Sequence, residues 1–276
     1  MLHLWPLDLD ARKLKMGGRF VQKKWNRRQL VALCAAAGTG SAASLVFARQ
    51  ARADDKRAAM RAVPWPYQTL DAAAVAQRAF ESFRKHHCMY GAFESIAGSV
   101  TDRLSAPFSD FPFEMFAYGA GGINGWATIC GALNGAAAAF QLFSSKPEPL
   151  IDTLFNWYET AQLPDFNPKG TKFAPVGSVA NSPLCHQSIA NWCKASGRKS
   201  YSPERQERCG TLTASVARKA VSLLNDQAAG KLVVLAPSPA TQACQSCHEK
   251  GGSLENVRTA MDCRGCHAPL IGNHPK

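Results

Sequence analysis

The sequence predicts a mainly α-helical body, residues 54–230, followed by a loop-rich C-terminal segment, residues 231–276. Cap residues and helical spacing recur through the body, whereas proline and glycine interrupt the chain from residue 231 onward. An alternating pattern occurs only over 231–235, which predicts one short strand. The chain has 276 residues, 46% of them hydrophobic, which is enough for a large core and excludes a disordered or fibrous protein.

Cap residues mark where the helices of the body begin. Asp71 can cap a helix that runs to about residue 100. Ser202 can cap a long helix that extends to Asn225 or beyond, because a proline and a glutamate follow it in the first turn. Two further helices are expected, from the Pro147 corner to before Pro164 and over 182–195.

A glycine-rich stretch, 119–125, follows a proline-broken aromatic loop, 107–118, and leads into an alanine-rich run ending at Phe140. Glycines in this number could form a dinucleotide-binding loop, but no apolar strand precedes them and the next helix is almost uncharged. Small residues that allow close helix packing or close approach of a cofactor are therefore the favoured interpretation.

Residues 1–53 differ from the rest in charge, with ten basic and two acidic side chains. The pair Arg27-Arg28, the mildly apolar run after it and the small residues Ala51 and Ala53 resemble a twin-arginine signal peptide cleaved before Asp54. An N-terminal membrane anchor is the alternative, although the run is short and polar for a span. We therefore expect a periplasmic protein, exported by the twin-arginine pathway, with no stable membrane insertion after signal cleavage.

The export signal also accounts for most of the net charge. Eight of the formal +12 belong to residues 1–53, which leaves +4 on the mature chain. The mature chain has no basic patch interleaved with aromatic residues, so nucleic acid is not an expected partner.

Two CxxCH motifs near the C-terminus are the strongest chemical signal. In this spacing two thiols attach to the vinyl groups of one haem c and the adjacent histidine reaches the iron. The expected haem thioether residues are Cys244, Cys247, Cys263 and Cys266, and the expected proximal ligands are His248 and His267. The short separation of the motifs predicts two haems held close together.

The four motif cysteines also fit the spacing of a zinc ribbon. A four-thiolate zinc site does not require the histidine that follows each pair, and haem c is attached outside the cytoplasm, where the export signal directs the chain. Both observations favour haem over zinc, and disulfides within such short pairs are a more distant alternative.

Each haem iron needs a second axial ligand or an open site. The candidate distal ligands are His86, His87, His186 and His274, with Met60, Met89, Met115 and Met261 also available. His87 shares an expected helical face with Phe83 and Tyr90, so packing at the edge of a core is an alternative role for it. The histidine count allows two ligands on each of two haems.

The body contains five further cysteines, Cys88, Cys130, Cys185, Cys193 and Cys209. Each alone is most simply a small buried residue. Together, beside a signal for export in the folded state, they indicate a site in which four thiolates hold an iron-sulfur cluster. Disulfides are the alternative in an oxidising compartment, although the odd count leaves one thiol over.

The order Cys88, Cys130-Gly131-Ala132, Gly135 and later single cysteines ending at Cys209 resembles the redox-active family named for its spaced cysteines and Gly/Cys/Ala motif. With two CxxCH motifs appended, the chain is similar to the split-Soret cytochromes c over roughly residues 86–267. The resemblance implies a homodimer with two bis-histidine haems per subunit, one axial histidine coming from the partner subunit, and an iron-sulfur cluster, for which 2Fe–2S is the expected form. It matches Cys88, Cys130 and Cys209 best and leaves the choice between Cys185 and Cys193 open.

The expected function is that of a periplasmic dihaem c-type cytochrome that transfers electrons between redox partner proteins. No catalytic residue is expected if both irons are fully ligated. The alternative is a haem enzyme that reduces a small nitrogen or sulfur oxyanion, which requires an iron with an open or displaceable position.

Overall fold

The computed structural model describes residues 49–52, 54–55, 62–104, 106–258 and 260–271. The chain divides into two units, residues 1–54 and 55–276, and the second contains all the features below. The twin-arginine pair, Met60 and His274 lie outside the described residues. None of the described helices is long and apolar enough to cross a membrane.

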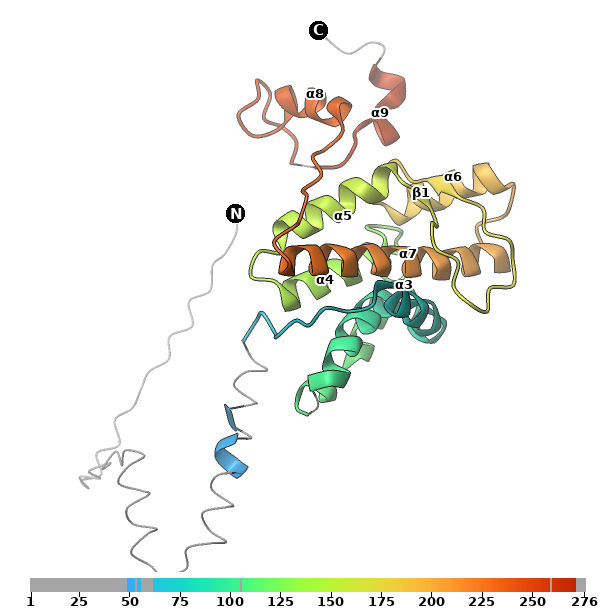
Figure 1. Ribbon diagram of the computed structural model, residues 1–276. Helices are drawn as coiled ribbons and strands as arrows, with labels where there is room; N and C mark the ends of the chain where they lie inside the picture. The colour runs from blue at the N-terminus through green and yellow to red at the C-terminus, as the bar shows by residue number, and fades with distance from the viewer. Residues whose placement is uncertain (1–48, 53, 56–61, 105, 259, 272–276) are drawn as a thin grey trace, which may run out of the picture. The chain divides into compact units, whose positions relative to one another are not determined.

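The second unit is mainly α-helical, which confirms the predicted fold class (Figure 1). Its α-helices are α3 (Ala72–Leu104), α4 (Gly131–Phe143), α5 (Glu148–Thr160), α6 (Cys185–Ser196), α7 (Pro203–Ala228), α8 (Pro239–His248) and α9 (Arg264–Ile271). Two 3-10 helices, η1 (Phe108–Asp110) and η2 (Phe113–Gly119), occupy the aromatic loop. Two short antiparallel strands, β1 (Gln162–Leu163) and β2 (Ser178–Val179), complete the described elements.

The predicted caps are present at both long helices. Asp71 Oδ1 accepts the backbone N–H groups of Ala73 and Ala74, at 2.8 and 3.2 Å, and so satisfies two donors at the start of α3. Ser202 Oγ accepts the N–H of Arg205 at 3.2 Å at the start of α7. Short-range sequence signals therefore place both helix starts correctly.

Helices α3 and α7 form the centre of the body. Helix α7 lies between α3 and α5 and also contacts α4 (Figure 1). Fully buried Phe93, Leu133 and Leu154 come from α3, α4 and α5 and belong to one apolar core. This packing brings the cysteines of four separate segments within reach of one another.

The structure corrects two expectations about the backbone. Residues 231–235 form no strand; the extended chain instead lies along α5, where Leu235 N–H donates to Thr153 Oγ1 at 3.2 Å. Helix α3 is not continuous, because His86 and His87 have non-helical dihedral angles and join two helical segments across a kink. The helical face predicted to link His87 with Tyr90 is therefore interrupted, and it is His86 that packs on Tyr90, with ring centroids 4.8 Å apart.

The C-terminal segment consists of loops and the short helices α8 and α9, as its composition predicts. Besides the bond from Leu235 N–H to Thr153, two more hydrogen bonds connect it to α5. Asn156 Nδ2 donates to Leu235 O at 2.8 Å, and Asp262 N–H donates to Glu159 Oε1 at 3.2 Å. Glu159 is buried, and its attachment to Asp262 fixes the chain immediately before the second CxxCH motif.

Candidate functional site

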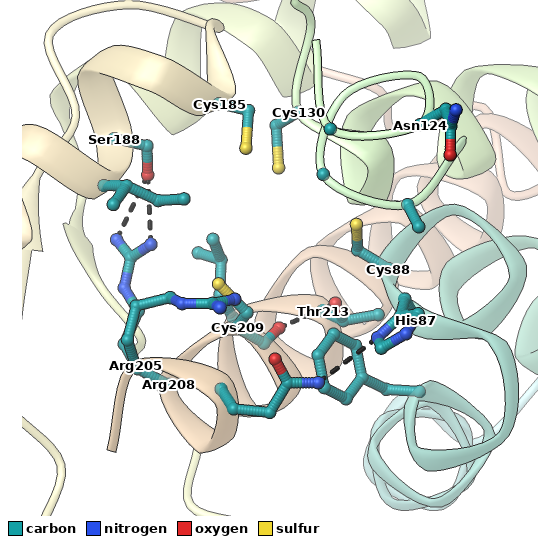
Figure 2. A pocket seen from close by; sticks show the side chains of 17 residues that line it. His87, Cys88, Asn124, Cys130, Cys185, Ser188, Arg205, Arg208, Cys209 and Thr213 are labelled. Carbon is teal, nitrogen blue, oxygen red and sulfur yellow. Dashed lines mark hydrogen bonds between the residues drawn. The ribbon is translucent and has the colours of Figure 1, made fainter. Parts of the chain in front are cut away.

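Four of the five body cysteines line one cavity of about 370 Å³, which we call the thiol pocket (Figure 2). They are Cys88, Cys130, Cys185 and Cys209. Cys193 is half-buried further along α6 and does not line the pocket. Helix α6 therefore places Cys185, and not Cys193, at the pocket with the other three cysteines.

Three of the pocket cysteines lie where a helical segment begins. Cys88 is the first residue after the kink in α3, Cys130 is the N-cap of α4, and Cys185 is the first residue of α6. The N-terminal end of a helix carries partial positive charge from its unpaired N–H groups. Three such ends at one pocket favour a negatively charged occupant and lower the cost of thiolate formation.

Backbone hydrogen bonds hold the starts of α4 and α6 together. Cys130 N–H donates to Pro183 O at 2.8 Å, and Cys185 N–H donates to Thr128 O at 2.7 Å. An isolated β-bridge pairs Ile129 with Leu184 between them. These reciprocal contacts fix two thiols side by side although 55 residues separate them in the sequence.

Glycines leave room for the thiols. A Cβ at Gly131 would lie 2.5 Å from Cys88 Sγ and would also meet Gly119 O, while a Cβ at Gly135 would meet Met89 O. Helix α4 therefore packs against the second half of α3 at a distance that only glycine allows. This close packing is the physical reason for the glycines at positions 131 and 135, after Cys130.

Burial controls the ionisation of the thiols when no metal is bound. It raises the pKa of Cys88 to about 12, helped by the neighbouring Cys130 and Cys209 thiols. Burial likewise raises the pKa of Cys130 and of Cys185, against the lowering effects of Tyr158 on Cys130 and of Arg208 on Cys185. Metal-free Cys88, Cys130 and Cys185 are therefore neutral at physiological pH, so metal binding must release protons from them.

The thiol pocket offers the donor atoms of an iron-sulfur cluster. Among the described residues, no three His, Cys, Asp or Glu side chains converge closely enough to hold one metal ion. Four thiols instead surround a wide cavity, and thiolates are the ligands of iron-sulfur clusters. The donor set therefore fits a polynuclear cluster.

Arg208 provides a second sign that the occupant is an anion. Its side chain lines the pocket and is 5% exposed, and its Nε has no hydrogen-bond partner. Within the described chain it forms no ion pair. An uncompensated buried cation is costly, and a cluster whose thiolates and sulfides outweigh the ferric charge would offset that cost.

The two CxxCH motifs lie on the short C-terminal helices. Helix α8 ends with Cys244, Cys247 and His248, and α9 contains Cys266 and His267, with Cys263 immediately before it. Burial raises the pKa of the Cys263 thiol, and the neighbouring Cys244 thiol, which is within hydrogen-bonding reach, raises it further. The first attachment points of the two motifs are therefore neighbours.

His248 is oriented by a side chain that sequence reasoning did not identify. Its Nδ1 lies 2.8 Å from Asn256 Oδ1. Hydrogen bonding of one ring nitrogen fixes the orientation of a ligating histidine and raises its basicity. Asn256 lies in a loop with no local pattern that would have revealed this role.

The described candidate distal histidines differ in their surroundings. His87 is exposed at the thiol pocket, with Nδ1 3.2 Å from Gln206 Nε2. His86 is half-buried against Tyr90, and His186 is exposed in the first turn of α6. The structure thus brings His87 to the thiol pocket.

The end of α5 connects the thiol pocket with the second CxxCH motif. Tyr158 is buried beside Cys130, and the next residue, Glu159, accepts the N–H of Asp262. The loop before α6 makes a second contact, since a Cβ at Gly265 would lie 3.1 Å from Asn181 O. The motif at 263–267 therefore lies against α5, whose Tyr158 adjoins Cys130, and against the loop that leads into α6 and Cys185.

Comparisons with known proteins identify the family of this chain. Residues 90–223 match the family described as "Putative redox-active protein (C_GCAxxG_C_C)". Split-Soret cytochrome c of Desulfovibrio desulfuricans is 38% identical over 229 residues, which cover 76% of this chain and 82% of the relative. A solved structure of split-Soret cytochrome c from the same species, described as having a novel iron centre, superposes with a TM-score of 0.70 at 37% identity, covering 77% of this chain and 93% of the other. The chain belongs to the split-Soret cytochrome c family.

Proposed function

We propose that this chain is an electron-transfer protein that carries two haems c on its C-terminal motifs and an iron-sulfur cluster in the thiol pocket. Its membership of a cytochrome c family supports redox function, and the iron centre of the related structure supports a second kind of iron site. The observation that carries the proposal is the convergence of four thiols from separate segments on one cavity.

The residues of the pocket define what they would do for a cluster. Cys88, Cys130, Cys185 and Cys209 would ligate the iron, and the three helix starts would offset the charge of the thiolates. A bound cluster supplies one-electron redox chemistry. Leu212 and Thr213, which are both buried, line the pocket, and Thr213 Oγ1 donates a hydrogen bond to Cys209 O at 2.8 Å.

The C-terminal motifs support haem attachment in the same way. The motif cysteines would form the thioether bonds, and His248 and His267 would be the proximal ligands. The proximity of Cys244 to Cys263 favours two closely spaced haems. The contacts made by Glu159 with Asp262 favour communication between these haems and the thiol pocket.

We extend the proposal to the cellular setting. The twin-arginine sequence favours export of the folded protein to the periplasm, where it would exchange electrons with redox partner proteins. The resemblance to split-Soret cytochromes c favours a homodimer in which the candidate histidines, His86, His87, His186 and His274, supply the distal ligands from one or both subunits.

Haem attachment and ligand binding test the proposal on the exported protein. Haem staining after denaturing electrophoresis and a pyridine haemochrome assay should show two covalent haems per chain. Carbon monoxide added to the reduced protein, and cyanide added to the oxidised protein, should leave the spectrum unchanged because each iron already has two axial ligands. A large spectral change at one haem would refute the carrier function and favour an enzyme with an open iron site. A colourless protein containing zinc would refute haem attachment.

A further inference from the structure

We propose that Arg208 is the fixed counter-charge of the thiol pocket, which selects an anionic cluster and stabilises its reduced state. This inference rests on the proposed cluster and deepens it. Arg208 is a positioning residue in this proposal, because it acts on the charge and placement of the site and provides no ligand to iron.

The hydrogen bonds of Arg208 fix its guanidinium at the pocket. Both terminal nitrogens donate to Ser188 Oγ at 3.1 Å (Figure 2). Nη2 also lies 3.4 Å from Ser178 Oγ. Tyr158 donates its hydroxyl to the same Ser188 Oγ at 2.9 Å. Serine hydroxyls orient the guanidinium but bring no negative charge to it.

The surrounding carboxylates are engaged elsewhere. No Asp or Glu is among the described residues that line the thiol pocket. A neighbouring cavity, which Arg208 also lines, contains Glu204 and Glu207. Glu204 pairs with Arg198 at 2.9 Å, and Glu207 accepts the backbone N–H groups of Lys172 and Phe173 at 2.7 to 2.8 Å.

Arg208 is close in the chain to one expected ligand and is hydrogen-bonded to the helix that carries another. It precedes Cys209 on α7, and its hydrogen-bond acceptor Ser188 is one turn from Cys185 on α6. Arg208 thus joins α7, the helix that carries Cys209, to α6, the helix that carries Cys185.

Reduction adds one negative charge to the cluster, while the guanidinium keeps its positive charge. The guanidinium therefore interacts more strongly with the reduced cluster than with the oxidised one. Net charge and nearby hydrogen bonds set the potentials of such clusters. Removing the positive charge should therefore lower the reduction potential. A tenfold loss in the preference for the reduced state corresponds to about 59 mV for one electron.

Arg208→Met tests the inference, with Arg208→Lys as the variant that keeps the charge. Arg218→Met is the matched control, because Arg218 lies on the same helix but has a carboxylate partner, Asp165, at 2.8 Å. The full chain with its covalent haems is stripped of non-haem iron, or reconstituted anaerobically with ferrous iron and sulfide. Thermal unfolding, iron and sulfide content, and the cluster potential are then measured in both forms.

Arg208→Met should stabilise the iron-free protein but weaken cluster binding in the reconstituted protein. In the iron-free protein the melting temperature should rise, because a buried charge without a partner has been replaced by an apolar side chain. In the reconstituted protein the affinity for the cluster iron should fall by about 10- to 100-fold, and the potential should drop. Arg208→Lys should retain most of the iron affinity, and Arg218→Met should change neither affinity nor potential.

The outcomes separate this inference from the proposed function. Wild-type protein without non-haem iron and sulfide after reconstitution would refute the cluster itself. Wild-type protein with a cluster, together with unchanged affinity and potential in Arg208→Met, would refute the counter-charge alone. Unfolding or a lower melting temperature of iron-free Arg208→Met would also overturn it, since Arg208 would then serve to hold α6 against α7.

Discussion

The short distance between Gly131 and the Cys88 thiol leads to a specific prediction about the thiol pocket. A Cβ at this position would lie 2.5 Å from Cys88 Sγ, whereas ordinary contacts begin at 3.4 Å, so the two atoms must separate by a further 0.9 Å or so. The backbone carbonyl of Gly119 blocks the same space. Gly131→Ala should therefore displace Cys88 from the other thiols.

Gly135→Ala is the matched control on the same helix. Its Cβ would meet Met89 O and lie 3.0 Å from Phe93 N, so it also crowds the contact of α4 with α3 but touches no cysteine. Overpacking costs about 1–3 kcal/mol, which the better helix propensity of alanine offsets by about 1 kcal/mol. For a unit of this size, each kcal/mol lowers the melting temperature by about 2–4 °C.

Thermal unfolding and iron titration of the two variants give the comparison. Both should lose thermal stability to a similar degree in the iron-free form. Only Gly131→Ala should also lose cluster affinity, by about 10- to 100-fold, the range typical of residues that hold ligands in place. Equal iron affinity in the two variants would refute the argument that Gly131 clears space for a ligand.

Three further predictions follow from the pocket and the kink. Cys185→Ser should abolish stable cluster binding, whereas Cys193→Ser should bind iron and sulfide as the wild type does; equal loss in both would contradict the pocket. Because burial raises the pKa of Cys88 to about 12, iron uptake must displace protons, and chelator competition between about pH 7 and about pH 8 should show affinity rising by about tenfold per pH unit for each thiol deprotonated. His87 has φ 65° and ψ −160°, a conformation nearly exclusive to glycine, so His87→Gly should increase the free energy of unfolding by about 1–3 kcal/mol in denaturant titrations, while His87→Ala should not.

The helices and their starts could be predicted because their signals are local. Asp71 and Ser202 satisfy N–H groups two or three residues away, so their roles depend only on neighbouring sequence. The kink at His87 could not be predicted in this way. Nothing near it in the chain marks a positive φ, and a histidine gives no signal of the kind that glycine gives.

The expected cluster ligands likewise could be predicted only in part from the sequence. The sequence identifies the five body cysteines but does not choose between Cys185 and Cys193, because both fall on one predicted helix. The choice depends on the register that the Thr128 and Pro183 hydrogen bonds impose on the start of α6. These bonds form between segments far apart in the sequence.

Arg208 was missed for a related reason. On α7 it follows a run of charged residues and has the pattern of an exposed helical face. Its burial comes from Ser178 and Ser188, which belong to other elements, so it becomes visible only when the packing of α6 against α7 is known.

The central claim is that four thiols of this chain hold an iron-sulfur cluster in addition to two haems c. Haem, non-haem iron and acid-labile sulfide should be measured together on the anaerobically purified, exported protein. We expect two haems per chain, with non-haem iron and sulfide present in the wild type and lost in Cys185→Ser. Two haems without non-haem iron or sulfide, or sulfide retained in Cys185→Ser, would contradict it.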